Sequence, residues 1–326
     1  MNDFTRFFSP KRPEDAERQL TRVQRQANLR WPRQQTLLGS ALRISPEASV
    51  FRGEREARAV VVKKFWELES RRAFVGQTTE ALDRLASLGP HPAFSFNELL
   101  ATSGHLGLVI ASFEGGTPVD KLLEEPDVNR RQLIKRCCDW QHWAEQGDFA
   151  QTGLNTDGLA AEINRLLQNC VQHRDAGLLV ELGSALLDML GGLAGKPVLK
   201  APGHPDFAPR NFIMREDGIL SAVDIHRVGK FVKTRQSAMF LVSKDFREME
   251  ISRPLLFGLD RQELRQFLTH GTVPAQEVNS LLIFFIGLTY FTMYARNPGK
   301  PRKMRVRRRR IRVFLAHLRQ GKRISR

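Results

Sequence analysis

Short apolar runs separated by turn-forming residues fill the chain between residues 34 and 66. Leu37–Ile44 is followed by the polar turn Ser45–Ala48, then by Val50–Gly53 and by the strongly apolar run Ala59–Phe65. Runs of this length, rich in aliphatic and β-branched residues and bounded by Pro, Ser and Gly, are typical of strands. The pattern therefore predicts three consecutive strands.

Helical spacing of apolar residues begins directly after these strands. Residues 67–89 are predicted to form a helix that ends at Gly89-Pro90, and its apolar stripe consists of Phe74, Thr78, Ala81, Leu82, Leu85 and Leu88. Phe94–Ala101 and Gly107–Phe113 then predict a further pair of strands. The Gly-containing turn Glu114–Pro118 follows.

Beyond this turn the sequence becomes mainly helical. Amphipathic stripes predict helices over residues 119–123, 129–145, 156–173 and 178–193. A later helix over Asp260–Leu268 has Asp260 as its expected N-cap. A strand-rich first part and a larger helical second part predict an α+β protein with two lobes.

The N-terminal 33 residues are basic and poor in apolar groups. Pro13-Glu14-Asp15 is a plausible helix start, and a thin apolar stripe follows at Ala16, Leu20, Val23 and Ala27. We expect a short amphipathic helix that packs on the domain or is partly disordered. The first residues lack the apolar core of a signal peptide.

The segment Val278–Ala295 is apolar enough to raise the question of a membrane span. Basic residues follow it at once, which is typical of a positively charged cytoplasmic flank. Its apolar run is nevertheless short of the ~20 residues that a span needs. We expect a buried helix of the C-terminal lobe and keep the span as the alternative.

The 51 Lys and Arg residues outnumber the 35 Asp and Glu residues, which gives a net charge of +16. Residues 296–326 contain 14 of the basic residues and no acidic one. Tails of this kind meet phosphate-bearing partners, either lipid headgroups or nucleic acid. The three cysteines fit no zinc-site spacing and no disulfide framework, which suggests a reducing compartment.

Apolar residues also recur at helical spacing inside the basic tail, at Ile311, Phe314, Leu315 and Leu318. A basic amphipathic helix of this kind lies in a membrane interface with its apolar face down, so we expect an anionic membrane surface as a partner. A solvated tail and a last helix packed on the lobe are the alternatives. Scarce aromatic residues disfavour base stacking and hence nucleic acid.

Candidate chemistry is concentrated in one stretch, Gly203–Phe212, which has the form H-x-D-x-x-x-x-N. Two prolines and a glycine keep it out of a helix. Asp217-Gly218 then predicts a hairpin between two short strands, with Asp224 just after it. The hairpin returns the chain, so Asp206 and Asn211 can converge with Asp224.

This arrangement resembles the catalytic centre of the protein-kinase-like phosphotransferases. That superfamily includes aminoglycoside phosphotransferases, choline kinases and lipopolysaccharide core sugar kinases. The resemblance implies that Asp206 orients or deprotonates the acceptor hydroxyl and that Asn211 and Asp224 hold Mg²⁺. His204 is expected to shape the loop rather than to transfer protons.

The resemblance extends upstream. Lys63 on the third strand resembles the lysine that grips the phosphates of ATP, and Lys64 points to the opposite face. Glu80, on the following helix, resembles the glutamate that pairs with that lysine. Backbone N–H groups of the turn after the first strand would bind phosphate, although the turn lacks G-x-G-x-x-G. Gly115-Gly116 resembles the hinge between the lobes.

Two shorter segments narrow the class of molecule expected as the phosphoryl acceptor. Asp224–Arg227 and Phe257–Leu268 resemble pieces of the lipopolysaccharide core heptose kinases. His226 and Arg227 are either site residues or merely packed near it. The sequence thus predicts an ATP-dependent kinase for a sugar hydroxyl of lipopolysaccharide core or a related glycan. A soluble choline- or aminoglycoside-type kinase and a non-catalytic nucleotide-binding pseudokinase are the alternatives.

These predictions divide the chain into four regions. Residues 1–33 are a basic N-terminal extension, and residues 34–113 are a nucleotide-binding N-lobe. Residues 114–295 are a C-lobe with the catalytic loop, and residues 296–326 are a basic amphipathic tail. We expect the protein in the cytoplasm, where binding of the tail to lipid would place it at the inner face of the cytoplasmic membrane.

Overall fold

The computed structural model describes residues 13–248, 250–270, 273–296 and 299–324. These residues fall into two compact units. The first contains residues 13–117 and 213–228, and the second contains residues 118–212 with the described part of 229–324. The boundaries therefore differ from the expected ones, because the hairpin segment 213–228 belongs with the N-terminal sheet.

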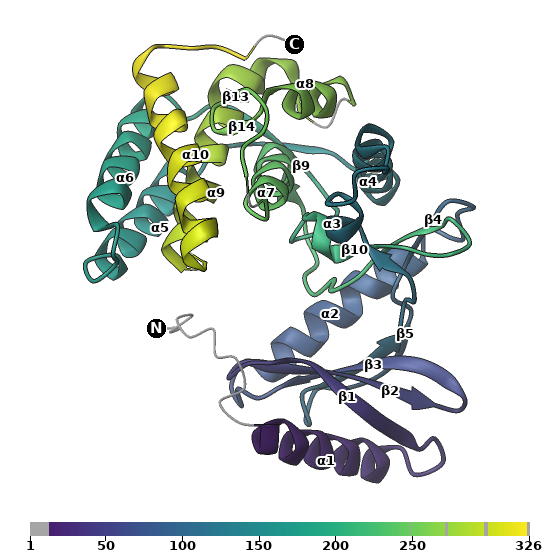
Figure 1. Ribbon diagram of the computed structural model, residues 1–326. Helices are drawn as coiled ribbons and strands as arrows, with labels where there is room; N and C mark the ends of the chain where they lie inside the picture. The colour runs from purple at the N-terminus through teal and green to yellow at the C-terminus, as the bar shows by residue number, and fades with distance from the viewer. Residues whose placement is uncertain (1–12, 249, 271–272, 297–298, 325–326) are drawn as a thin grey trace. The chain divides into compact units, whose positions relative to one another are not determined.

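The first unit is built on a five-stranded antiparallel sheet in the order β1-β2-β3-β6-β5 (Figure 1). Its strands are β1 (Thr36–Ile44), β2 (Ala48–Arg55), β3 (Arg58–Phe65), β5 (Leu99–Ser103) and β6 (Leu108–Ser112). The three predicted N-terminal strands and the turn between the first two are confirmed. Alternate residues of β3 are buried on opposite faces, so the sheet needs a cover on each side.

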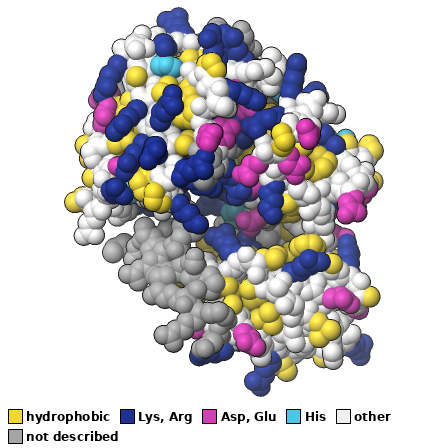
Figure 2. All heavy atoms as spheres, viewed as in Figure 1, with side chains coloured by type: hydrophobic (Ala, Val, Ile, Leu, Met, Phe, Trp, Pro, Cys, Tyr) yellow, Lys and Arg dark blue, Asp and Glu magenta, His cyan; other side chains and the backbone are white. Residues whose placement is uncertain are grey.

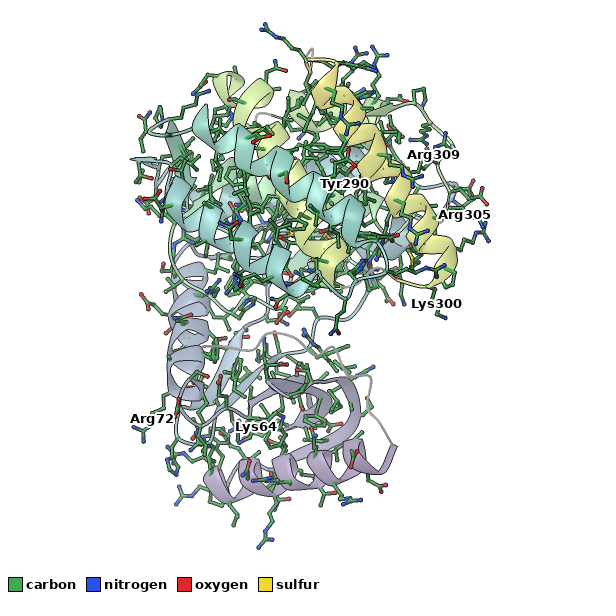
Figure 3. All side chains as sticks on the ribbon, turned by 90° about the vertical axis from the view of Figure 1, so that its left-hand side faces the viewer. Lys64, Arg72, Tyr290, Lys300, Arg305 and Arg309 are labelled. Carbon is green, nitrogen blue, oxygen red and sulfur yellow. The ribbon has the colours of Figure 1, made fainter. Side chains whose placement is uncertain are left out.

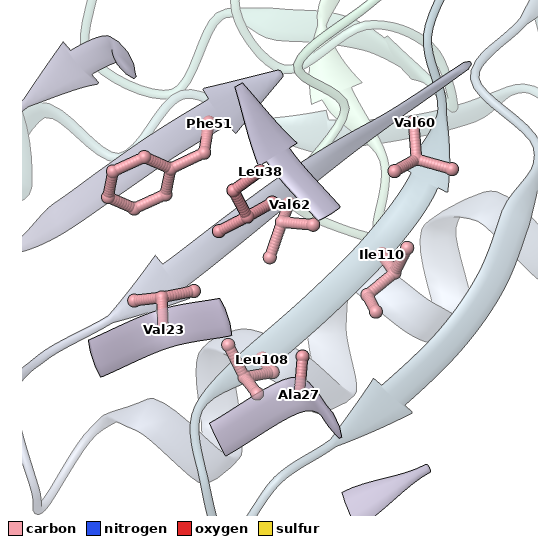
Figure 4. Packing of buried hydrophobic residues seen from close by; sticks show 8 residues of the cluster. All are labelled: Val23, Ala27, Leu38, Phe51, Val60, Val62, Leu108 and Ile110. Carbon is pink, nitrogen blue, oxygen red and sulfur yellow. The ribbon is translucent and has the colours of Figure 1, made fainter. Parts of the chain in front are cut away.

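Helix α1 (Pro13–Arg30) provides one of these covers. Val23 and Ala27 are fully buried against aliphatic and aromatic side chains of the sheet, as Figure 4 shows. Gln24 and Asn28 also accept hydrogen bonds of 2.7 Å from backbone N–H groups of the edge strand β1. The helix thus supplies core contacts and protects an exposed strand edge.

Helix α2 (Arg71–Ala86) covers the other face, where Phe65, Val75 and Val109 form a second cluster. The predicted pairing of 94–101 with 107–113 holds only for β5 and β6. The earlier residues form a separate strand, β4 (Phe94–Phe96), which pairs in parallel with β11 (Leu220–Ala222). This pairing ties the hairpin β10 (Phe212–Met214)–β11 to the first unit.

The second unit is mainly helical, as predicted. Its helices are α3 (Val119–Leu122), α4 (Arg130–Glu145), α5 (Thr156–Asn169), α6 (Ala176–Gly191), α7 (Lys233–Asp245), α8 (Arg261–Thr269), α9 (Ile283–Arg296) and α10 (Pro301–Arg319). A short 3₁₀ turn, η1 (Pro209–Asn211), ends the predicted loop. A second 3₁₀ turn, η2 (Ala275–Glu277), and a π-helical turn, η3 (Val278–Leu282), precede α9. The short strand β7 (Thr117–Pro118) stands where the chain passes from the first unit to the second. Small sheets of β8 (Ala150–Gly153), β9 (Pro197–Ala201) and β12 (Phe231–Val232), and of β13 (Leu255–Leu256) and β14 (Leu259–Asp260), complete it.

Helix α9 lies at the centre of this unit. By length and composition, Ala275–Arg296 could cross a membrane, but 72% of its most apolar window is buried inside the protein. Gly287 allows close approach, because a Cβ added there would lie 2.5 Å from the ring of Phe314 on α10. The structure therefore supports the buried helix over the span.

Helix α10 corrects the prediction for the basic tail. Its apolar stripe is not available to a membrane, because Ile311, Phe314 and Leu315 are at most 3% exposed. They pack inside the second unit, where α10 contacts α6, α9 and β13. Amphipathic spacing identifies an apolar face but not its cover, and here the cover is the protein's own lobe.

Candidate active site

The predicted loop is held from behind by buried side chains of the second unit. His204 is fully buried, and its Nδ1 accepts a 3.1 Å hydrogen bond from the backbone N–H of Asp206. Its backbone N–H donates to Gln141 on α4, and its carbonyl accepts from Gln236 on α7 at 2.6 Å. The geometry fits the loop-shaping role that the sequence suggested for His204.

Gly203 is needed at the start of this loop. A Cβ added there would lie 2.0 Å from Nε2 of Gln141, a separation that a heavy-atom contact does not tolerate. The absence of a side chain lets the loop pack directly against α4. The ring of His204 then sits 6.2 Å from Trp140 and 5.8 Å from Phe212, which fixes its orientation.

Asp206 and Asn211 come together as predicted. Nδ2 of Asn211 donates to the carbonyl of Asp206 at 2.7 Å and to its Oδ2 at 3.0 Å. Since the amide nitrogen serves these two bonds, Oδ1 is the Asn211 atom suited to a cation. The loop therefore holds a carboxylate and an amide side by side.

Arg210 is a site residue that the sequence analysis missed. Its Nη2 lies 2.5 Å from Oδ2 of Asp206, four residues earlier, and its side chain is 37% exposed. A guanidinium here neutralises the carboxylate and keeps donors near any phosphate that approaches it. The signal was present in the sequence, because Arg210 stands inside the H-x-D-x-x-x-x-N stretch, four residues after Asp206.

A second pair lies in the first unit. Nζ of Lys63 on β3 is 2.6 Å from Oδ1 of Asp224, although the residues are 161 positions apart in sequence. Asp224 has a positive φ of 61°, which costs a non-glycine residue roughly 1–2 kcal/mol. The parallel pairing of β11 with β4 keeps the segment that leads to Asp224 in the same unit as Lys63. Strain at this position suggests that its geometry serves a function.

The adjacent lysine has a different environment. Lys64 is 3% exposed on the α1 side of β3, where its ammonium donates to the carbonyl of Leu106. Burial, assisted by the positive charges of Arg71 and Arg22, lowers the pKa of Lys64 to about 8. The strand period therefore separates a lysine that meets a carboxylate from one enclosed in the core.

The structure does not support the expected pairing of Lys63 with Glu80. The buried face of α2 consists of Val75, Thr78, Ala81, Leu82 and Leu85. Glu80 is exposed and lies on the opposite side of the helix. Lys63 instead meets Asp224, so a carboxylate of the hairpin segment takes the place expected for the helix glutamate.

The turn between β1 and β2 is a poor phosphate cradle in this structure. The register of β2 with β3 puts the turn at the same end of the sheet as Lys63, which pairs with Val50. Ser45 and Ala48, however, use their backbone N–H groups in hydrogen bonds within the turn. Pro46 has no N–H to offer, so Glu47 alone has a backbone donor suited to phosphate.

Two further candidates can now be placed. Nδ1 of His226 lies 2.7 Å from the backbone oxygen of Asp224, so His226 helps to fix that residue. Arg227 is exposed. In the expected hinge, a Cβ added to Gly116 would lie 2.3 Å from the carbonyl oxygen of Met214, so glycine is required for this close approach.

No protein-family model matches the chain, and none of the curated proteins matches it in sequence. Its fold is nevertheless shared by many solved structures. The chain has the mixed α+β fold of these structures, with a sheet-based N-terminal region and a helical C-terminal region, as predicted.

Choline kinase LicA from Streptococcus pneumoniae is one such structure, with a TM-score of 0.61 and 11% identity over 92% of this chain and 99% of the other. Aminoglycoside phosphotransferase APH(4)-Ia has a TM-score of 0.59 and 11% identity over 91% and 98%. Spectinomycin phosphotransferase APH(9)-Ia, in complex with ADP and spectinomycin, has a TM-score of 0.55 and 10% identity over 93% and 94%.

Proposed function

We propose that this protein is a kinase that transfers the γ-phosphoryl group of ATP to a hydroxyl group, on a sugar of lipopolysaccharide core or a related glycan. The observation that carries the proposal is the contact of Asp206 with both Arg210 and Asn211 in a loop held from behind. The ion pair of Lys63 with Asp224, in the first unit, is the second observation that supports the proposal. Neighbouring folds include proteins described as kinases and bound to AMP or ADP.

In this proposal each group has a separate task. Asp206 accepts a hydrogen bond from the acceptor hydroxyl and receives its proton as the oxygen attacks phosphorus. Lys63 contacts the phosphates of ATP. Asn211 and Asp224 offer an amide oxygen and a carboxylate, the oxygen ligands that Mg²⁺ prefers. When bound, Mg²⁺ would neutralise charge on the phosphates.

The alternatives are a soluble kinase for small alcohols and a nucleotide-binding pseudokinase. The neighbours include kinases for choline and aminoglycosides, which are cationic, whereas this chain carries a net charge of +16. A strongly basic protein is a poor host for cationic acceptors. The intact set of Asp206, Asn211 and Asp224 argues against the pseudokinase.

Two substitutions test the division of tasks. Asp206→Asn should reduce transfer by at least about 100-fold and leave binding of Mg-ATP nearly unchanged. Asp224→Asn should weaken the binding of Mg-ATP itself. Titration calorimetry measures binding, and turnover with choline, an aminoglycoside and deacylated core oligosaccharide measures activity. Loss of nucleotide by Asp206→Asn with retention by Asp224→Asn would refute the assignment.

We further propose that the protein acts in the cytoplasm, at the inner face of the membrane, through the outer face of α10. Arg305, Arg309 and Arg312 share this face and are exposed, and no ion pair links them to another described residue. Figures 2 and 3 show Lys and Arg side chains gathered along the helix, with Arg305 and Arg309 pointing outward. Binding would be electrostatic and without insertion, because the apolar face is buried.

A vesicle assay tests this proposal. The protein should co-sediment with anionic vesicles at low salt, and Gln at positions 305, 309 and 312 should weaken binding strongly, since each basic residue contributes roughly 1 kcal/mol. Truncation before α10 is unsuitable, because it would remove core residues such as Phe314. Gln at the equally exposed Arg165 serves as the control. Binding that ignores lipid charge would contradict the proposal.

A further inference from the structure

Three adjoining cavities line one side of the second unit. The first, of about 350 Å³, lies between α3 and the end of α7 and is lined by Asp120, Leu123, Arg130 and Glu248, among others. A second, smaller cavity shares Arg130 and Glu248 with the first. The third, of about 500 Å³, shares Arg253 and Asp260 with the second. Shared lining residues make the three cavities one groove, here called the α3–α8 groove.

One end of the groove adjoins the catalytic loop. Both α3 and α7 pack against η1, the turn that carries Arg210 and Asn211. Asp120 on α3 lines the first cavity and forms an ion pair with Arg247, which follows α7. A ligand in this cavity therefore lies next to the elements that support Asp206, so the groove is placed to receive an acceptor.

The two ends differ in charge. The first cavity has four acidic and three basic side chains, and the basic ones are ion-paired: Arg130, Lys244 and Arg247. The third cavity has four arginines and one acidic residue: Arg131, Arg253, Arg261, Arg265 and Asp260. Asp260 and Glu263 form ion pairs with Arg253, so the charge available to a ligand comes from the other arginines of this cavity.

Two of the arginines at the distal end are available to a ligand. Arg131 and Arg261 are exposed, and within the described part of the chain neither has a carboxylate at ion-pair distance. They come from α4 and α8, two helices that pack against each other. Guanidinium groups on two rigid helices suit a phosphate or carboxylate, because each can donate two parallel hydrogen bonds.

We infer that the α3–α8 groove binds an extended acceptor, with the reacting hydroxyl near the catalytic loop and an anionic substituent at Arg131 and Arg261. This inference rests on the proposed function and narrows its substrate class to anionic oligosaccharides. The shared chemistry is an oxyanion, supplied by a sugar phosphate or by a sugar carboxylate. A cationic or neutral acceptor would bring no oxyanion to Arg131 and Arg261.

The test measures binding of deacylated lipopolysaccharide core oligosaccharide to the full-length protein by titration calorimetry, without nucleotide. Arg131→Ala/Arg261→Ala should weaken binding at least about tenfold. Arg165→Ala/Arg174→Ala is the matched control, because it removes the same charge from exposed positions on and after α5. Phosphatase-treated and carboxyl-reduced oligosaccharides identify the anion, since only loss of the recognised group reproduces the tenfold weakening in the wild-type protein.

Equal affinities of the two double variants would overturn the inference, and so would undiminished wild-type binding after both anionic groups are removed. Failure of wild-type protein to bind the oligosaccharide has the same consequence. Measurements of turnover distinguish failure of the groove inference from failure of the proposed kinase function. Phosphoryl transfer with a KM insensitive to Arg131→Ala/Arg261→Ala refutes the groove alone, whereas arginine-dependent binding without transfer to any acceptor refutes the kinase assignment alone.

Discussion

The two adjacent lysines of β3 allow one prediction to be worked out quantitatively. Lys64 is 3% exposed and holds its ammonium against the carbonyl of Leu106 and 5.2 Å from the ring of Trp66. Its pKa of about 8 lies below the ordinary value of 10.5. A lowering of this size means that keeping the charge inside the protein costs roughly 3 kcal/mol of folding free energy.

The sign of the pH dependence follows directly. Below pH 8 both the folded and the unfolded chain carry the proton on Lys64, so the full cost is present. Between pH 8 and about 10.4 the unfolded chain binds more protons than the folded one, so stability rises with pH. The wild-type protein should therefore gain up to roughly 3 kcal/mol from this group across that interval.

Lys64→Met removes the charge and preserves most of the side-chain volume. The carbonyl of Leu106 loses a donor, which costs about 1–3 kcal/mol. Near pH 7 the two effects leave the variant as stable as the wild type or more stable by about 1–2 kcal/mol. Above pH 8 the rise in stability should be absent from the variant. Urea unfolding at pH 7, 8, 9 and 10.5 measures both quantities.

Lys63→Met is the matched control. It should keep the wild-type pH slope, because Lys64 is untouched, and lose turnover by about 100-fold, as expected for a donor to transferring phosphate. Lys64→Met should keep turnover within about twofold. An identical pH slope in wild type and Lys64→Met would refute the argument from burial, and equal turnover of the two variants would remove Lys63 from the site.

Two further predictions concern the second unit. Burial acts to raise the pKa of Glu263, but its ion-paired neighbours, led by Lys244, outweigh it and lower the pKa to about 2. Glu263→Gln should therefore lower the free energy of unfolding by about 3–5 kcal/mol at pH 7. The variant should also show a smaller loss of stability than the wild type between about pH 4.5 and 2. Denaturant unfolding measures both effects, and an unchanged pH dependence in acid would contradict this prediction. Gly287→Ala should lower the melting temperature, because the added Cβ meets the ring of Phe314 and overpacking costs about 1–3 kcal/mol. The control Gly177→Ala has open space around it and should be neutral or stabilising. Equal effects of the two substitutions would argue against tight packing at Gly287.

Features that depend on neighbours in the sequence could be predicted. The turn at Ser45–Ala48, the hairpin at Asp217-Gly218 and the N-cap Asp260 all appear where the sequence indicated them. The contact of Asp206 with Asn211 is equally local, because the two residues are only five positions apart in a proline-restricted loop. Such features are determined by backbone preferences that need no tertiary partner.

Features that depend on which surface covers a helix could not be predicted. Glu80 resembles the helix glutamate that pairs with the strand lysine, yet it is exposed and the buried face of α2 is centred elsewhere. The sequence likewise could not show that Asp224 would meet Lys63, since that contact requires the parallel pairing of β11 with β4. Periodicity fixes the spacing of side chains on an element but leaves the partner of each face undetermined.

The arginines of the basic tail do not all have the same role, although they are close together in the sequence. Arg310 is 1% exposed and forms ion pairs with Asp245 and Glu248, so its charge is neutralised inside the lobe. Arg307 is also buried and donates to the backbone oxygen of Phe246. Such arginines hold α10 against α7 and the chain that follows it, and their removal would destabilise the fold.

The outward arginines of the same helix have the opposite role, because no described carboxylate pairs with Arg305, Arg309 or Arg312. One helix thus uses alternate faces for folding and for attraction of anions, in phase with its 3.6-residue period. Substitutions at Arg310 should therefore change stability, while those at Arg309 should change only the response to anionic surfaces and to salt. Separating the two classes by helix phase makes the membrane proposal testable without damaging the lobe.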